Sequence, residues 1–375
     1  MIFLLILGGA QALMLFFLLL GKRSIKIPDY ILSGYLLLSA LIILLAYLEI
    51  WNRNSGYPYP WLINISTPFI LLIGPAIWLY VKSLTDQHFR FKPVYLLLLF
   101  PFLLVVTMLM VGNYLKPDSA KIIIEQTEQF KGQPSFFVII TLIALSNLGY
   151  TLWGLILIGR YRKKLKTYFS QTDSINLAWL RFLLISAFVC YASISLLYLA
   201  DAFFNLMSYH TLQLIAFGIA SVFVLVLGFF GIKQGDVFTS IPDKFDMDGA
   251  LATSFSSKKV EKREEEFVHS LLSYMRDSKP YQNPDITIAS LAKELNVSPE
   301  YLSSIINGRL NLNYFDFINH FRIEEFKAMC KNPKNKNFTL IGLAYDCGFN
   351  SKATFNRVFR KVVGRTPSEY LKSLK

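Results

Sequence analysis

Seven long apolar runs alternate with short polar segments over the first 231 residues. Each run is long enough to cross the hydrocarbon core of a bilayer, about 30 Å, as an α-helix. The runs lack the period-2 alternation of barrel strands, and a backbone crosses lipid only as a helix or a closed barrel. The sequence therefore predicts an all-α chain that begins with a seven-helix transmembrane domain, 1–231. Its spans are expected at about 1–20, 30–50, 65–81, 94–112, 136–158, 180–200 and 211–231.

The third run is the least regular, because it contains Pro68 and the pair Gly74-Pro75. Proline removes a backbone hydrogen bond from a helix, but neighbouring groups in a membrane bundle can satisfy the carbonyl that is left free. We therefore expect a kinked helix here rather than a broken one.

Basic residues in the connections predict the orientation, since Lys and Arg cross a membrane poorly. The connections after the first, third and fifth runs carry twelve basic residues, and the other connections carry four. This asymmetry predicts an N-terminus outside the cell and, after seven crossings, a cytoplasmic C-terminus. Alternatively, the first run is a signal peptide cleaved near Ala10-Gln11-Ala12, which would leave six helices and the same C-terminal side. No basic residue precedes the run, which argues against cleavage.

The composition changes behind the last span. Residues 232–258 contain Gly, Asp, Ser, Thr and Pro with little apolar periodicity, which indicates a cytoplasmic linker. The remainder, 259–375, has the composition of a soluble domain. Its first segment predicts an amphipathic helix with Phe267, Leu271, Leu272 and Met275 on one face. That face packs on the following domain or pairs with a second copy of the chain as a short coiled coil.

Residues 286–308 have the pattern of a helix-turn-helix unit. Thr287 is positioned to cap the first helix, Asn296-Val297 form the turn, and Ser298 caps the second helix with Pro299 at its first position. Small hydrogen-bonding side chains on an exposed helix face suit the major groove of DNA. On this helix the predicted DNA-facing residues are Glu300, Ser303, Ser304 and Asn307.

The pattern repeats at 338–363. Thr339 is a plausible cap, Gly348-Phe349-Asn350 form the turn, and Ser351 caps a helix. Its predicted buried face consists of Phe355, Val358, Phe359 and Val362. The opposite face displays Lys352, Ala353, Asn356, Arg357 and Arg360. Arg can bind guanine with two hydrogen bonds, Asn can bind adenine, and Lys or Arg can hold phosphates.

An amphipathic helix, 314–331, joins the two units. Eighteen residues give a rod of about 27 Å, which can place two recognition helices about one DNA turn, ~34 Å, apart. The charge agrees with this arrangement. Residues 331–375 hold ten basic and two acidic residues, and the whole chain carries a formal charge of +13. We therefore expect double-stranded DNA as a partner.

Other chemistry has little support in the sequence. The three cysteines, Cys190, Cys330 and Cys347, and the four histidines show no metal-ligand spacing. We find no phosphate-binding loop or nucleophile motif, so we predict no metal, no cofactor and no enzymatic activity.

Several polar and aromatic residues lie near the predicted outer ends of the spans. Intramembrane ionisable groups are often functional, so these residues are candidates for the rim of an outward-facing ligand pocket. The alternative is that they only reach interfacial water, with the tryptophans in an aromatic belt. The candidate residues are Glu49, Trp51, Trp61, Asp201 and His210.

The stretch GFNSKATFNRVFRKVVGRTPSEY at 348–370 resembles the signature of AraC/XylS-type transcription regulators. LAKELNVSPEYLSSIINGRL and the run Phe321-Arg322-Ile323 resemble the same domain, so the likeness covers about 265–375. It implies a seven-helix DNA-binding domain with base contacts from both recognition helices. Many relatives have a basic residue where Ser304 stands, which implies a smaller contribution from the first unit. A membrane half replaces the usual soluble sugar-binding sensor, as in a membrane-bound bacterial subgroup.

The leading hypothesis is a one-component transcription regulator of the bacterial inner membrane that responds to an unidentified envelope or membrane signal. Its expected partners are DNA, membrane lipid, a signal ligand or membrane protein, and a second copy of the chain. In one alternative the membrane half is only an anchor, and proteolysis in 232–258 releases the domain. In another the protein is a transporter or receptor whose C-terminal domain binds proteins.

Overall fold

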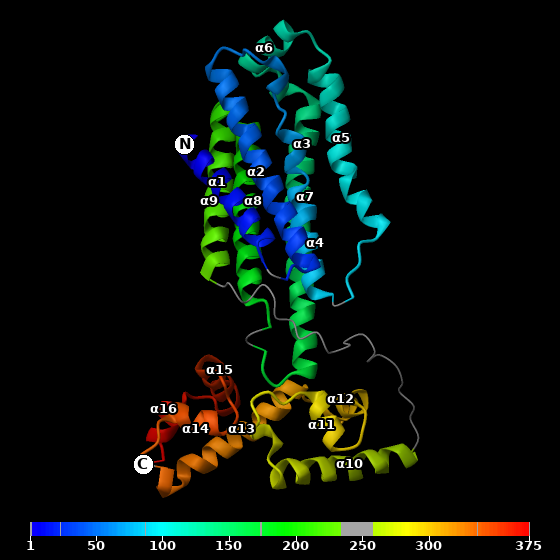
Figure 1. The fold of residues 1–375 in the computed structure, drawn as a ribbon, viewed down its shortest axis with the longest axis vertical. Helices are drawn as coiled ribbons and strands as arrows, with labels where there is room; N and C mark the ends of the chain where they lie inside the picture. Colours follow the sequence, from blue (N-terminus) through cyan, green and yellow to red (C-terminus); the bar gives the residue numbers. More distant parts are fainter. Residues whose placement is uncertain are drawn as a thin grey trace. The chain divides into compact units, whose positions relative to one another are not determined.

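The computed structural model describes residues 2–22, 24–86, 88–172, 175–233, 258–335 and 337–374. The chain divides into two compact units (Figure 1). The first comprises 1–159 and 177–240, and the second comprises 160–176 and 241–375. The predicted linker, 232–258, lies outside the described residues except at its ends, where Lys233 ends one helix and Lys258 begins the next.

The first unit contains seven helical segments that are long and apolar enough to cross a membrane, which confirms the predicted number among the described residues. Five are single helices: α1 (Ile2–Leu20), α2 (Ile27–Asn54), α7 (Pro134–Tyr168), α8 (Ala178–Phe204) and α9 (Tyr209–Lys233). The third segment, Pro60–Thr85, joins η1 (Pro60–Leu62), α3 (Thr67–Ile70) and α4 (Ile73–Thr85). The fourth, Pro93–Tyr114, joins η2 (Pro93–Leu99), α5 (Phe100–Leu109) and the π-helical turn η3 (Met110–Tyr114).

Large apolar side chains cover much of the surface of this unit. Phe3 on α1 is 75% exposed, Leu97 on η2 is 71% exposed and Phe203 on α8 is 77% exposed. A soluble protein rarely leaves apolar surface of this extent in contact with water, whereas lipid makes such exposure favourable. The unit therefore has the surface of a multi-pass membrane protein.

The third segment is interrupted ahead of Pro75, since α3 ends at Ile70 and α4 begins at Ile73, rather than continuing as the one kinked helix that we expected. Pro75 has no N–H to donate to the Leu71 carbonyl one turn earlier. Ser146 of α7 supplies the missing donor, because its hydroxyl lies 3.3 Å from that carbonyl oxygen. The helices approach closely at this point: a Cβ added to Gly74 would lie 2.9 Å from the Ser146 carbonyl oxygen. The carbonyl that Pro75 leaves free is thus satisfied by a neighbouring helix, as expected for proline in a membrane bundle.

Two features of the first unit and its boundary differ from the sequence pattern. The connection predicted at 113–135 contains two short helices, α6 (Asp118–Gln126) and η4 (Gln129–Gly132). Helix α7 continues ten residues beyond the predicted end at 158, through a basic stretch that belongs to the second unit. Helix-favouring Arg and Lys side chains allow this extension into a polar environment.

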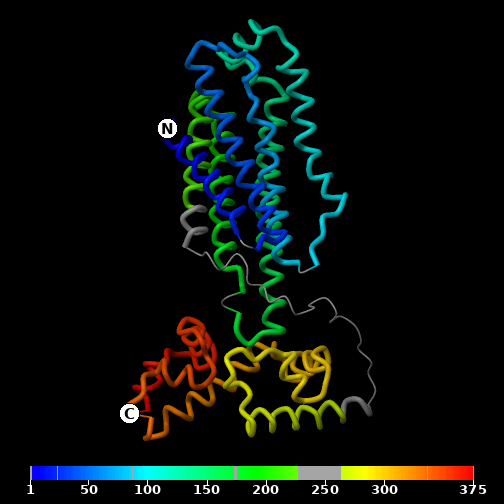
Figure 2. The backbone as a smooth tube through the Cα atoms, viewed as in Figure 1, coloured from blue at the N-terminus to red at the C-terminus, as the bar shows by residue number. Residues whose placement is uncertain are grey.

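The second unit is all-α, and Figure 2 traces it from α10 to the C-terminal helix. It comprises α10 (Lys258–Asp277), η5 (Pro280–Gln282), α11 (Ile288–Glu294), α12 (Pro299–Gly308), α13 (Tyr314–Lys331), η6 (Pro333–Asn335), α14 (Leu340–Asp346), α15 (Lys352–Val363) and α16 (Pro367–Lys372). Helix α13 has the predicted bounds of the joining helix.

Helix α10 packs on the first helix-turn-helix unit. Leu271 and Met275 are fully buried, Phe267 meets the edge of the Tyr301 ring at 5.1 Å, and Arg309 forms an ion pair with Glu264 at 2.7 Å. The apolar face predicted for this helix is thus covered within a single chain. This favours packing on the domain over a coiled coil.

Candidate nucleic-acid interface

The first recognition helix, α12, begins as the sequence predicts. The Ser298 hydroxyl accepts a hydrogen bond from the Tyr301 backbone N–H, and Pro299 follows the cap. Leu302, Ile305 and Ile306 are buried. Of the four predicted DNA-facing residues, Glu300, Ser304 and Asn307 are exposed.

Ser303 differs from its neighbours on α12, since it is only 8% exposed. Its hydroxyl oxygen accepts a hydrogen bond from Asn307 Nδ2 at 3.2 Å. It lies at the boundary between the two faces, where helical spacing alone does not determine burial. Ser303 is therefore placed to orient the Asn307 side chain rather than to lie open on the helix surface.

The second recognition helix, α15, has the predicted cap and the predicted exposed face. The Ser351 hydroxyl accepts from the Thr354 backbone N–H, and Gly364 ends the helix at φ +80°. The exposed residues are Lys352, Ala353, Asn356, Arg357 and Arg360. Arg357 Nη2 lies 3.5 Å from the Thr354 hydroxyl oxygen, so the guanidinium group is directed along the helix.

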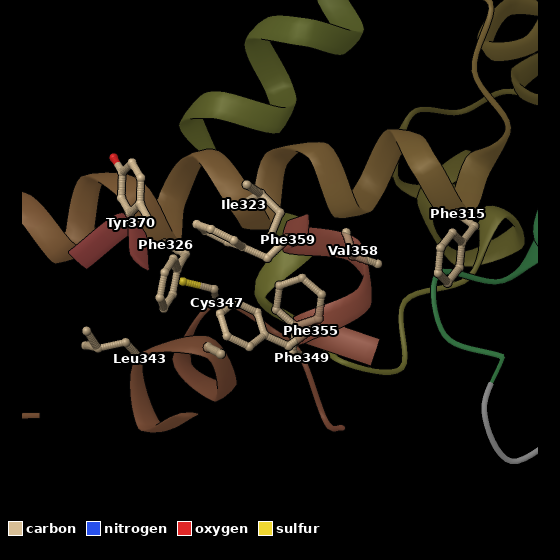
Figure 3. Packing of buried hydrophobic residues seen from close by; sticks show 11 residues of the cluster. Phe315, Ile323, Phe326, Leu343, Cys347, Phe349, Phe355, Val358, Phe359 and Tyr370 are labelled. Carbon is tan, nitrogen blue, oxygen red and sulfur yellow. The ribbon is translucent and has the colours of Figure 1, made fainter. Parts of the chain in front are cut away.

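An aromatic core packs α15 against α13 (Figure 3). Phe355 packs against Phe326 of α13 at 4.8 Å and against Phe359 at 5.7 Å between ring centroids. Tyr370 of α16 closes the core against Phe359 at 5.6 Å. The prediction was wrong for Val362, which is 41% exposed. Val363 packs against the core in its place, because it lies four residues after Phe359 and therefore on the same helix face.

A buried guanidinium group connects the two helix-turn-helix units. Arg322 of α13 is fully buried, and its Nε and Nη2 donate to the carbonyl oxygens of Tyr281 (2.7 Å) and Asn283 (2.9 Å) ahead of the first unit. The same group lies 5.7 Å from the centroid of the Phe349 ring, in the turn of the second unit. Burial lowers the pKa of Arg322 to about 10, so the group stays charged at neutral pH. A buried charge is stable only when it is well hydrogen-bonded, which ties these segments together.

The turn of the second helix-turn-helix unit requires glycine. Gly348 has φ +95°, and a Cβ at this position would lie 2.3 Å from the Tyr281 carbonyl oxygen and 2.9 Å from that of Gln282. The close approach places Arg322 against the turn. The sequence pattern identified Gly348 from its turn geometry, but it did not indicate the contact with Tyr281.

Residues 160–176 belong to the same compact unit as the two helix-turn-helix units, and they also pack on these elements. Ser170 is 1% exposed; its hydroxyl donates to the Ile286 carbonyl at 2.8 Å, and its carbonyl oxygen accepts from Asn319 Nδ2 of α13 at 3.2 Å. Gln171 Nε2 donates to the Gly348 carbonyl at 2.9 Å. Sequence reasoning missed these contacts, because polar residues in a short connection have no periodicity.

The five candidate pocket residues of the first unit occupy different environments. Glu49 is buried and accepts hydrogen bonds from the Ser66 backbone N–H (2.6 Å) and from Gln213 Nε2 (2.8 Å). Asp201 is buried and accepts from Lys131 Nζ at 3.0 Å. His210 Nδ1 lies 3.8 Å from a Glu125 carboxylate oxygen. Trp51 and Trp61 are 41% and 56% exposed.

The first unit also contains a cavity of about 230 Å³. None of the five candidate residues belongs to its described lining, which comes instead from other positions on α2, α6, α7, α8 and α9. A ligand site in this half, if formed by the cavity, would therefore use residues that sequence reasoning did not select.

Comparison with known proteins agrees with this geometry. Residues 291–373 match a family described as "Helix-turn-helix domain". Over 85 residues the chain is 34% identical to the uncharacterized HTH-type transcriptional regulator YijO of Escherichia coli strain K12, covering 23% of this chain and 29% of that protein. It is 26% identical over 89 residues to the Msm operon regulatory protein of Streptococcus mutans, covering 24% and 31%.

A third relative is the uncharacterized HTH-type transcriptional regulator YpdC of Escherichia coli strain K12, 26% identical over 102 residues, covering 27% of this chain and 34% of that protein. The chain thus spans about a third of the length of these curated relatives. No solved structure matches the chain significantly. Residues 291–373 therefore form a helix-turn-helix domain of the AraC type, which confirms the resemblance for that part of the chain.

We predict that Gly348→Ala destabilises the second helix-turn-helix unit, so that it opens more often. Gly308→Ala serves as the matched control. The first change strains a left-handed residue and places a methyl group against two backbone carbonyls, whereas a Cβ at Gly308 meets nothing within 4 Å. The expected destabilisation exceeds about 2 kcal/mol, or roughly thirtyfold in the opening equilibrium.

The readout is alkylation of Cys347 in the full chain, followed by peptide mass spectrometry. This thiol is fully buried, and burial raises its pKa to about 12, so it reacts only when the unit opens. Labelling should accelerate in the Gly348 variant and stay unchanged in the control. Equal rates in the two variants would show that the turn does not need glycine.

Proposed function

We propose that the chain is a membrane-embedded transcription regulator that binds promoter DNA through both helix-turn-helix units. The observation that carries the proposal is the attachment of an AraC-type domain, matched over 291–373, to seven membrane-length helices in one chain. The relatives' names include a transcriptional regulator and an operon regulatory protein, which supports regulation of transcription as the role of the shared domain.

On this proposal the two recognition helices make different contributions. Helix α15 presents three basic side chains and Asn356 on one exposed face, so it supplies phosphate contacts together with guanine and adenine contacts. Helix α12 presents Glu300, Ser304 and Asn307, which carry no positive charge. The second helix-turn-helix unit therefore provides most of the affinity for DNA, and the first helix-turn-helix unit adds selectivity.

The chain is oriented with its C-terminal half in the cytoplasm, where the chromosome is accessible. The distribution of Lys and Arg supports this orientation, since twelve basic residues lie in the connections on the proposed cytoplasmic side. The basic stretch at the end of α7 lies on that side and belongs to the same compact unit as the DNA-binding domain. The proposed location is the inner membrane of a bacterium.

Segment 160–176 is the proposed connection between the membrane half and DNA binding. It continues α7 and contacts the start of the first unit, the joining helix α13 and the turn of the second unit. We therefore propose that the segment fixes the separation of the two units, so that a shift of α7 changes their spacing and the fit to a two-site operator.

The first test is Arg357→Ala in the full chain, with Lys327→Ala on α13 as the control of equal charge. Lys327 pairs with Glu324 at 2.9 Å and lies outside both recognition helices. Loss of a base-contacting arginine should weaken binding by about 1–3 kcal/mol and relax sequence preference at one base pair. Binding is measured on genomic fragments recovered with the full chain, across a range of salt concentrations.

The Lys327 variant should keep the base preference of the unmodified protein. If Arg357→Ala left both affinity and base preference intact, α15 would not be the recognition helix. If the full chain bound its recovered fragments no more tightly than unrelated DNA, the proposed function would fail.

The second test addresses the connection. Ser170→Ala and Gln171→Ala together remove three hydrogen bonds, each worth up to about 1 kcal/mol. They run from the Ser170 hydroxyl to the Ile286 carbonyl, from Arg322 Nη2 to the Ser170 hydroxyl (3.4 Å), and from Gln171 Nε2 to the Gly348 carbonyl. We expect roughly tenfold weaker binding to a two-site operator and little change on an isolated half-site. Ser186→Ala is the matched control, since the Ser186 hydroxyl bonds only within α8, to the Phe182 carbonyl. Unchanged two-site affinity in the double variant would contradict the proposed role of the segment.

A further inference from the structure

The cavity in the first unit is long, and its walls are mainly apolar. Its lining on α9 extends from Tyr209 to Val224, which is about 22 Å of helix at 1.5 Å per residue. Apolar side chains on α2, α7 and α9 form most of the wall, among them Ile43, Ile139 and Phe217. The volume of about 230 Å³ exceeds that of a cavity of about 150 Å³ that accepts benzene. Such a space suits one extended hydrocarbon chain.

Among the described residues, two buried polar atoms on the cavity wall have no hydrogen-bond partner. They are Oε2 of Glu125 on α6 and Oδ1 of Asn147 on α7, and each residue is 3% exposed. Both atoms are acceptors. Buried polar atoms in native proteins are nearly always satisfied, so orphaned acceptors on a cavity wall indicate a ligand that donates hydrogen bonds. The other oxygen of Glu125 is occupied, because it accepts from Arg53 Nη2 at 2.9 Å.

The charges around Glu125 favour a cation. Arg53 pairs directly with Glu125, and Gln213 connects it to Glu49. Lys131 pairs with both Glu128 and Asp201. Lys121, which also lines the cavity, pairs with Asp118 at 2.9 Å. These described residues comprise five carboxylates and three cations, with His210 between Glu125 and Glu128. Burial raises the pKa of Glu125, while its ion pair with Arg53 opposes this shift.

We propose that this cavity binds a cationic amphiphile, with a single apolar chain between the helices and an amine headgroup that donates to Oε2 of Glu125. The apolar walls supply most of the affinity, and the carboxylates at the α6 end select the charge of the headgroup. Asn147 offers an acceptor for a second donor along the ligand. The inference rests on the proposed function in one respect: it assigns a chemical class to the signal sensed by the membrane half.

The binding step is tested without DNA, so its failure is distinguishable from failure of the proposed function. The full chain is placed in lipid nanodiscs, and the binding of tritiated dodecylamine is measured and corrected for uptake by empty nanodiscs. We expect saturable binding near one molecule per chain. Glu125→Gln should weaken it at least about tenfold, since a charge-assisted hydrogen bond is lost.

A second variant fills the cavity and leaves the carboxylates around Glu125 unchanged. Ala220→Phe adds a ring to the lining of α9 and should abolish saturable binding, whereas Val222→Phe adds the same ring at a side chain that is 46% exposed and should not. All variants should retain DNA binding, which shows that they fold. Saturable binding of tritiated dodecanoate at equal strength, or dodecylamine uptake equal to that of empty nanodiscs, would overturn the proposal.

Discussion

The DNA-binding half depends on one buried charge. Arg322 is fully buried in α13, the helix that joins the two units, and it can remain charged there only because backbone carbonyls of Tyr281 and Asn283 surround it. These carbonyls belong to the chain segment that enters the first helix-turn-helix unit, while Phe349 of the second helix-turn-helix unit covers the guanidinium group. Loss of the charge would leave several acceptors unsatisfied at once. The contacts of Arg322 thus hold the two recognition helices at a fixed separation in the folded domain.

Local signals in the sequence predicted most of this half. Each helix-turn-helix unit begins with a hydroxyl cap, at Thr287 and Thr339, and both caps accept the expected backbone hydrogen bond. Capping depends on neighbouring residues only, so spacing is sufficient to find it. Helical periodicity placed the apolar faces, but it failed at their margins, where Ser303 is buried and Val362 is exposed. At such positions the end of the helix and the neighbouring side chains decide the outcome.

Contacts between distant segments were not predictable. Ser170 bonds to Asn319 across 149 positions of sequence, and nothing in the local pattern marks either residue as a partner of the other. The same holds in the membrane unit, where the Ser146 hydroxyl bonds to the Leu71 carbonyl that Pro75 leaves free, and where Glu125 lines a cavity from the connection between the fourth and fifth spans. Composition and charge distribution predicted seven membrane-length helices, yet the residues that line the cavity follow from packing. The polar groups that join distant segments in both halves are therefore placed by tertiary structure.

The separation of the recognition helices tests the central role of Arg322 most directly. Spin labels introduced through non-natural amino acids at Ser304 and Asn356, both exposed, allow the distance between α12 and α15 to be measured by double electron–electron resonance in the full chain. The account predicts one narrow distance distribution that broadens in an Arg322→Gln variant. A distribution equally broad in the unmodified chain would contradict it, because the two units would then move independently despite the buried guanidinium group.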